Sequence, residues 1–131
     1  MNPKRVNISS GGLWETKVGY SRAVRVGNMI AVAGTTATDS EGKVIGIGDA
    51  YTQTKVILEK IEKSLREAGA SMKDVVRTRM FVTDISKWDD IGRAHGEMFG
   101  SIRPAATLVE VRALITKDTL VEIEVEAILS E

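Results

Sequence analysis

The stretch Leu120-Val-Glu-Ile-Glu-Val-Glu-Ala-Ile-Leu129 decides the fold. Its apolar residues alternate with Glu122, Glu124 and Glu126, which is typical of a strand with one buried and one polar face. Such a strand needs an apolar layer on one side only. The sequence therefore predicts a sheet that is covered on one face and charged on the other.

Two amphipathic helices are available to cover the apolar face. Between Ala50 and Ala68, apolar residues recur at i, i+3, i+4 and i+7 spacing, and Gly69 supplies a C-terminal stop. A second helix is predicted from the N-cap candidate Ser86 to Gly100, and Pro104 prevents its continuation. Its predicted apolar stripe consists of Trp88, Ile91, His95, Met98 and Phe99.

The remaining strands follow from alternation and turn signals. Residues 1–12 are predicted to be an irregular lead-in, with structure starting near Tyr20, and residues 36–48 to form a loop or a second hairpin. Gly27-Asn28 predicts a hairpin turn. The predicted strands cover residues 20–26, 29–33, 75–82, 106–114 and 120–129.

The order ββ-α-β-α-ββ predicts an α+β two-layer sandwich, with one mixed sheet and both helices on its apolar face. No linker divides the chain, so residues 1–131 are expected to form a single domain. Alternation places Val76 on the helix side and Phe81 on the charged side. On the strand after Pro104 it favours Thr107, Val109, Val111 and Ala113 for the helix side and Ala106, Leu108, Glu110 and Arg112 for the charged side.

The charged face has two interpretations. Its side chains are either solvated, as on most charged sheet faces, or paired across a subunit interface. The predicted charges are Arg77, Arg79, Arg112, Glu110, Glu122, Glu124 and Glu126.

Composition excludes several functions. The chain has 131 residues with 18 basic and 18 acidic side chains, a formal net charge of zero. This balance argues against nucleic-acid and membrane-surface partners, which require a basic footprint. The absence of cysteine excludes disulfides, thiolate nucleophiles and zinc ribbons. Since no signal or membrane segment is evident, a cytoplasmic location is expected.

Few residues can carry chemistry. His95 is the only histidine, so no histidine metal cluster can form, and its place on an apolar helix stripe favours a packed or capping role. A glutamate of the last strand can act as a general base, because burial raises the pKa of a carboxyl group unless a cation compensates. For any single glutamate, an ion pair is the favoured role.

Four segments occur in a characteristic order: YSRAVRVGNMIAVAGT from Tyr20, VRTRMFVTD from Val76, RPAATLVEV from Arg103 and VEIEVEA from Val121. Together they resemble the Rid/YjgF family of imine and enamine deaminases, from about Tyr20 onward. The resemblance implies a sheet backed by two helices, a homotrimer with the sheets turned inward, and three clefts between subunits.

In the RidA branch of that family, water hydrolyses 2-imino acids or their enamine tautomers to 2-keto acids and ammonia without a metal or cofactor. An arginine directly after Pro-Ala holds the substrate carboxylate. Here Ala106 follows Pro104-Ala105, and Arg103 lies on the wrong side of the proline. Losing that bidentate contact should weaken binding of a 2-imino acid about 10- to 1,000-fold. Arg112 would lie roughly 20 Å away along a strand, so it would serve another region or pair with a glutamate.

The resemblance also implies site residues. Tyr20 and Glu122 are the expected catalytic pair: Glu122 matches the glutamate that positions the attacking water, and Tyr20 matches a cleft tyrosine, whose hydroxyl group can donate to a developing anion or amine. Gly92 stands where an asparagine commonly faces the substrate. The expected substrate-binding residues are Gly34, Thr35, Phe81, Gly92, Ala106 and Leu108.

Three functions remain open. The first is a metal-free hydrolase for a small imine or enamine other than a simple 2-imino acid. The second is a non-enzymatic trimer that binds a small ligand or a protein. The third is the endoribonuclease activity claimed for the family, which the zero net charge argues against. The expected partners are copies of the chain and a small imine, enamine or carboxylate ligand, with no nucleic acid and no membrane.

Overall fold

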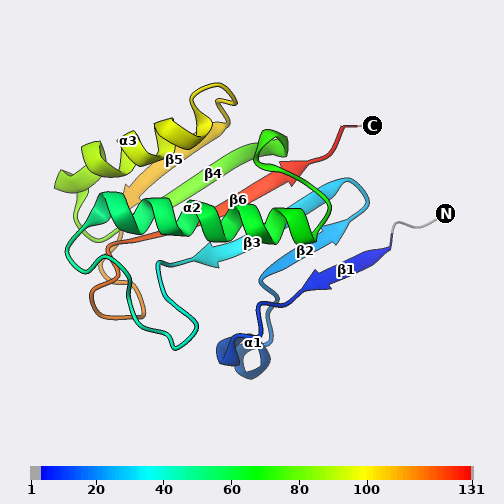
Figure 1. Cartoon of the computed structure of the whole chain (residues 1–131), viewed down its shortest axis with the longest axis horizontal. Helices are drawn as coiled ribbons and strands as arrows, with labels where there is room; N and C mark the ends of the chain where they lie inside the picture. Colours follow the sequence, from blue (N-terminus) through cyan, green and yellow to red (C-terminus); the bar gives the residue numbers. More distant parts are fainter. Residues whose placement is uncertain (1–3, 131) are drawn as a thin grey trace.

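A mixed six-stranded sheet forms the centre of the structure, a computed structural model that describes residues 4–130 (Figure 1). The strand order is β1-β2-β3-β6-β4-β5, and every neighbouring pair is antiparallel except β4 and β5. The strands are β1 Arg5–Ile8, β2 Ala23–Val26, β3 Met29–Thr35, β4 Val75–Val82, β5 Ala105–Glu110 and β6 Val121–Ile128.

Helices α2 (Ala50–Glu67) and α3 (Trp88–Phe99) lie side by side on one face of this sheet (Figure 1). The predicted α+β architecture is therefore confirmed. Asp49 caps α2 by accepting a hydrogen bond from the Thr52 amide at 3.0 Å. The core between helices and sheet contains the fully buried Ile30, Ile57, Leu58, Ile61, Leu65, Ile91, Phe99 and Ile123.

The start of α3 differs from the prediction. A short 3₁₀ turn, Ile85–Lys87, precedes the helix, and the Asp84 carboxylate accepts from the Ser86 amide at 3.0 Å. Ser86 is therefore not the N-cap of α3. Trp88 is 57% exposed, because it opens the helix before the packed stripe begins.

The N-terminal region was wrongly predicted to be irregular, although residues 1–3 lie outside the described part. Strand β1 extends the sheet at the edge, and helix α1 (Leu13–Val18) follows it. Neither carries the usual pattern, since β1 buries little surface and α1 exposes its apolar side chains while burying Glu15. That carboxylate is held by the hydroxyl groups of Ser9 and Ser10.

The face assignment of β5 was also wrong. Its parallel register places Ala106 beside Thr78 and Leu108 beside Met80, both of which face the helices. The strand ends at Glu110, whose carboxylate accepts from the Ile85 amide at 2.9 Å in the helix layer. Both faces of this short strand are nearly equally apolar in sequence, so alternation alone could not orient it. Glu110 and Arg112 are therefore not part of the charged face.

Two β-bulges interrupt the alternation. One, between Val75 and Arg77, leaves Val76 42% exposed instead of buried against the helices. The other lies in β3 between Val32 and Thr35, and it contains Gly34. Residues 36–48 form a loop with a single bridge, Thr38 to Val44. None of the helices in the described part combines the length and apolarity that a membrane span requires.

Candidate functional site

The sheet face opposite the helices carries the candidate site. The side chains of Glu122, Glu124 and Glu126 lie on this face and are half-buried, while the alternate residues of β6 are buried against the helices. Register places Arg79 beside Glu124, and Phe81 beside Glu122. The two-sided character predicted for the last strand is confirmed.

Two of the three glutamates form ion pairs with one arginine. Arg79 Nη1 lies 3.3 Å from Glu124 Oε1 and 2.9 Å from Glu126 Oε1. This bears out the ion-pair role favoured for any single glutamate in the sequence. Glu122, by contrast, forms no hydrogen bond or ion pair with another residue between 4 and 130.

Glu122 is held against the backbone of Gly34. A Cβ atom at position 34 would overlap Glu122 Oε2, so only glycine permits this approach. Burial raises the pKa of the Glu122 carboxyl group, Arg22 partly offsets the rise, and Glu124 adds to it. A half-buried carboxylate without a partner and with a raised pKa has the properties of a general base.

Arg22 is the residue beside this site that sequence reasoning missed. Its Nη2 donates to the Gly34 carbonyl oxygen at 2.7 Å, and its Cζ lies 5.5 Å from the centroid of the Tyr20 ring. Its Nε atom is buried without an acceptor. Backbone pairing with Ala33 and alternation from Val24 could have placed Arg22 on this face, but no catalytic motif drew attention to it.

A shallow hollow of about 410 Å³ adjoins this cluster and is bordered by Tyr20 and Glu124. Tyr20 is 39% exposed. Glu122 and Gly34 do not line the hollow, but each lies close in sequence to a residue that does, Glu124 and Ala33. Its other lining residues are Arg5, Asn7, Gly19, Ser21, Val24, Ala31 and Val32.

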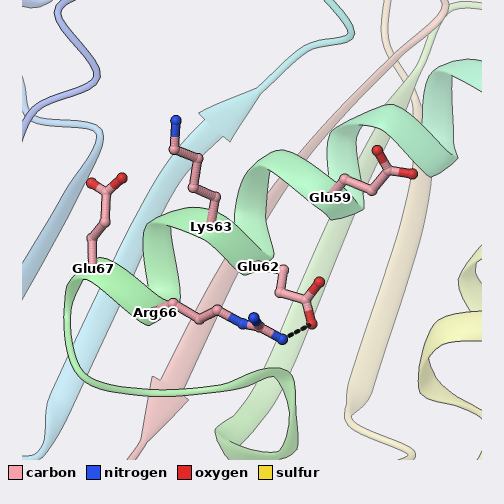
Figure 2. A pocket seen from close by; sticks show the side chains of 5 residues that line it. All are labelled: Glu59, Glu62, Lys63, Arg66 and Glu67. Carbon is pink, nitrogen blue, oxygen red and sulfur yellow. Dashed lines mark hydrogen bonds and ion pairs between the residues drawn. The ribbon is translucent and has the colours of Figure 1, made fainter.

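A second depression of about 390 Å³ lies on the outer surface of α2 (Figure 2). Its charged side chains all come from this one helix, and Arg66 pairs with Glu62 at 3.3 Å. The arrangement is that of a solvated helix face with an i,i+4 ion pair. The lining residues are Glu59, Glu62, Lys63, Arg66 and Glu67.

The other expected site residues lie elsewhere in the chain. Thr35 is buried, with its hydroxyl donating to the Ala33 carbonyl at 2.8 Å. Gly92 is exposed on α3, whereas Ala106 and Leu108 point to the helix side of the edge strand β5. Four strand spacings, about 19 Å, separate β2 from β5. Tyr20, Gly34, Phe81 and Glu122 share the open face, so a single chain does not bring them together with Ala106 and Leu108.

His95 is packed, as favoured from the sequence. Its Nε2 lies 2.9 Å from Thr78 Oγ1, its ring contacts Phe99, and burial lowers its pKa. No group of three His, Cys, Asp or Glu side chains among residues 4–130 is arranged to hold a metal ion.

Comparison with known proteins identifies the family. The family model described as Endoribonuclease L-PSP matches residues 14–129. A relative named 3-aminoacrylate deaminase RutC, from Acinetobacter baylyi, is 36% identical over 79% of this chain and 82% of its own length. The chain belongs to the Rid/YjgF family.

Two further proteins match almost end to end. The crystal structure of a YjgF/YER057c/UK114 family member from Mycobacterium tuberculosis superposes with a TM-score of 0.87 and 48% identity, covering 96% of this chain and 100% of that chain. An uncharacterized protein of Streptomyces coelicolor is 41% identical over 92% of this chain and 89% of its own length. The Rid/YjgF resemblance and its fold are thus confirmed.

Proposed function

We propose that this Rid/YjgF chain hydrolyses a small imine or enamine to a carbonyl compound and ammonia, with Glu122 as the general base. One observation carries the proposal: of the three glutamates on the open face, Glu122 alone lacks a cationic partner among the described residues and has a raised pKa. The name of the Acinetobacter baylyi relative, an enamine deaminase, supports the same reaction class.

The chemistry requires little from the protein. Glu122 accepts a proton from water as the water oxygen bonds to the electrophilic carbon, and the C=N electron pair moves to nitrogen. Tyr20 donates a hydrogen bond to the nitrogen, and the proton held by Glu122 passes to that nitrogen, which gives a neutral carbinolamine. Glu122 then takes the hydroxyl proton and returns it to the nitrogen as the C–N bond breaks, so that ammonia leaves and the carbonyl product remains. An enamine first takes a proton on carbon to give the imine.

The proposal includes a homotrimer with the cleft between subunits. In support, an apolar row crosses the open face in register, formed by Val26, Met29 and Ile128, which are 40%, 50% and 53% exposed. Exposed apolar patches of this kind are typical of interfaces. The separation of Glu122 from Ala106 within one chain points the same way.

The second candidate is a trimer that binds a ligand without turning it over. The alanine at position 106 and the glycine at position 92 favour it, because two polar side chains expected at the substrate are missing. Endoribonuclease activity is supported only by the family description, and the zero net charge argues against it.

The test is hydrolysis of a panel of imines and enamines, generated in the cuvette and followed by release of ammonia, by wild type, Glu122→Gln and Glu126→Gln. Loss of a general base should lower turnover about 10²- to 10⁴-fold in Glu122→Gln. Glu126→Gln is the matched control, since Glu126 lies on the same strand face but is bound to Arg79.

Equal turnover by Glu122→Gln and wild type would contradict the proposal. Binding of panel products without turnover of any substrate would favour the second candidate, and cleavage of RNA that is lost in Glu122→Gln would favour the third. Light scattering after size-exclusion chromatography measures the mass of the assembly, which we expect to be that of three chains.

A further inference from the structure

Arg22 is positioned for binding but forms no ion pair within residues 4–130. Its terminal atom Nη2 is anchored on the Gly34 carbonyl, while Nη1 makes no hydrogen bond in this part of the chain. The same Gly34 contacts the Glu122 carboxylate. The Arg22 guanidinium group and the Glu122 carboxylate therefore both contact Gly34, but they do not form an ion pair with each other.

The guanidinium group is also held in one orientation. The Gly34 bond, the enclosed Nε atom and the Tyr20 ring restrict it on three sides. A group that is already ordered loses little conformational entropy when it binds a ligand. The buried Nε–H of Arg22 has no acceptor among residues 4–130, which is unusual for a buried N–H group in native proteins.

The other arginines near the sheet do not share these properties. Arg5 lines the hollow but is exposed, and its Nε donates to Asn7 Oδ1 at 3.0 Å. Arg79 is engaged by two glutamates. Arg25 donates to the carbonyl groups of Gly27 and Ala68 on the helix side. Arg77 lies beside Glu126, four strand residues or about 13 Å from Glu122, and Arg112 lies beyond the end of β5.

We propose that Arg22 binds the carboxylate of the substrate and so replaces the arginine that is absent at Ala106. The inference rests on the proposed hydrolysis and narrows its substrates to imines and enamines that carry a carboxylate. The anionic end binds at Arg22, and the nitrogen-bearing carbon is directed toward Glu122. A guanidinium fork matches the two oxygens of a carboxylate, which a neutral ketone or amide cannot offer.

The experiment measures binding of 2-oxobutanoate, a stable 2-keto acid, by calorimetry, with 2-butanone as the uncharged probe and inorganic phosphate as the second anion. Loss of a charge-assisted hydrogen bond should weaken 2-oxobutanoate binding about 10- to 150-fold in Arg22→Gln. Arg77→Gln, a half-buried arginine on the same face, is the control and should bind within about two-fold of wild type. Binding of 2-butanone should be unchanged in both variants.

Undiminished binding by Arg22→Gln would overturn the inference, and so would an equal loss in Arg77→Gln. Stronger binding of phosphate than of 2-oxobutanoate would assign a general anion site instead. Arg22→Gln loses the hydrogen bond to the Gly34 carbonyl and could fail to fold for that reason; Arg22→Lys is then the substitute variant. Lysine keeps the positive charge but not the paired N–H donors of the guanidinium group, so wild-type affinity for 2-oxobutanoate in Arg22→Lys would contradict the proposal. Glu122→Gln should keep 2-oxobutanoate binding while losing turnover, so failure of the carboxylate anchor and failure of the hydrolysis are separate results.

Discussion

The two faces of strand β6 differ in what their side chains require from the rest of the molecule. On the helix side, Ile123 and Val125 are buried by residues of the same chain. On the open side, Arg79 satisfies Glu124 and Glu126, but Glu122 has no partner in the described part of the chain. One face is thus packed within a single chain, whereas the other carries a half-buried carboxylate without a partner among residues 4–130. Stability and function are therefore separable by mutation.

The largest effect on stability is expected from Ile123→Ala. Its side chain is fully buried, so truncation removes apolar contacts and leaves a cavity, at a cost of about 2–5 kcal/mol in the free energy of unfolding. Chemical denaturation measures the change. Met29→Ala, half-exposed on the other face, is the control and should alter unfolding far less while weakening subunit association. Similar losses in both variants would mean that the open face is also a core.

The next largest effect is expected on turnover in Gly34→Ala. The new Cβ must displace the Glu122 carboxylate, so we expect turnover to fall by about 10-fold or more, as for a misplaced catalytic group. Gly96→Ala on α3 is the matched control, because nothing lies within 4 Å of the added Cβ. That variant should be as active as wild type, and stabilised by up to about 1 kcal/mol through helix propensity. Full activity in Gly34→Ala would exclude Glu122 as the base.

A smaller effect concerns pH. Because burial raises the pKa of Glu122, the acid limb of the pH–rate profile should lie above the ordinary glutamate pKa of 4.5. Removing the Arg22 charge should move the limb to higher pH still, since Arg22 lowers this pKa.

The native state also binds the Glu122 proton more tightly than the unfolded chain does, so the contribution of Glu122 to stability is greatest at low pH and is lost as pH rises through the raised pKa. Glu122→Gln should remove both dependences, and an acid limb that persists in it must come from another group.

The smallest effect is expected from Arg79→Gln. Its ion pairs are partly exposed, so their loss should lower thermal stability slightly, and added salt should reduce the difference from wild type. Thermal melts at low and high ionic strength measure this. A large loss that salt does not change would mean that Arg79 is buried in the assembly.

The sequence predicted those helices and strands in which apolar residues recur at a regular spacing. The helix from Ala50 and strand β4 were found to within a residue or two, because their apolar residues repeat over several turns or pleats. The sequence did not predict β1, which buries little surface, or α1, whose buried residue is a glutamate. It assigned the side chains of β5 to the wrong faces, because the two faces of that strand are about equally apolar. In each case the missing information lies in a neighbouring strand or side chain.

The site was predictable only in part for a similar reason. Glu122 and Tyr20 were named from a resemblance, but the choice among the glutamates depends on which of them Arg79 reaches, and that is set by the register of two strands distant in sequence. Arg22 was missed because a lone arginine in a strand carries no motif. Its significance comes from the carbonyl to which it is bound.

The bulge in β3 bears on how this site could be altered. A bulge adds one residue to one strand, so deleting Gly34 would restore the regular ladder, with Val32 and Thr35 still opposite Val125 and Ile123 and still facing the helices. The acceptor for Arg22 and the seat for Glu122 would disappear in the same event. A Rid/YjgF chain that lacks the extra residue would have the same fold but not the Gly34 backbone that contacts Arg22 and Glu122. The number of residues between the positions of Val32 and Thr35 is therefore a simple test for the site in other sequences.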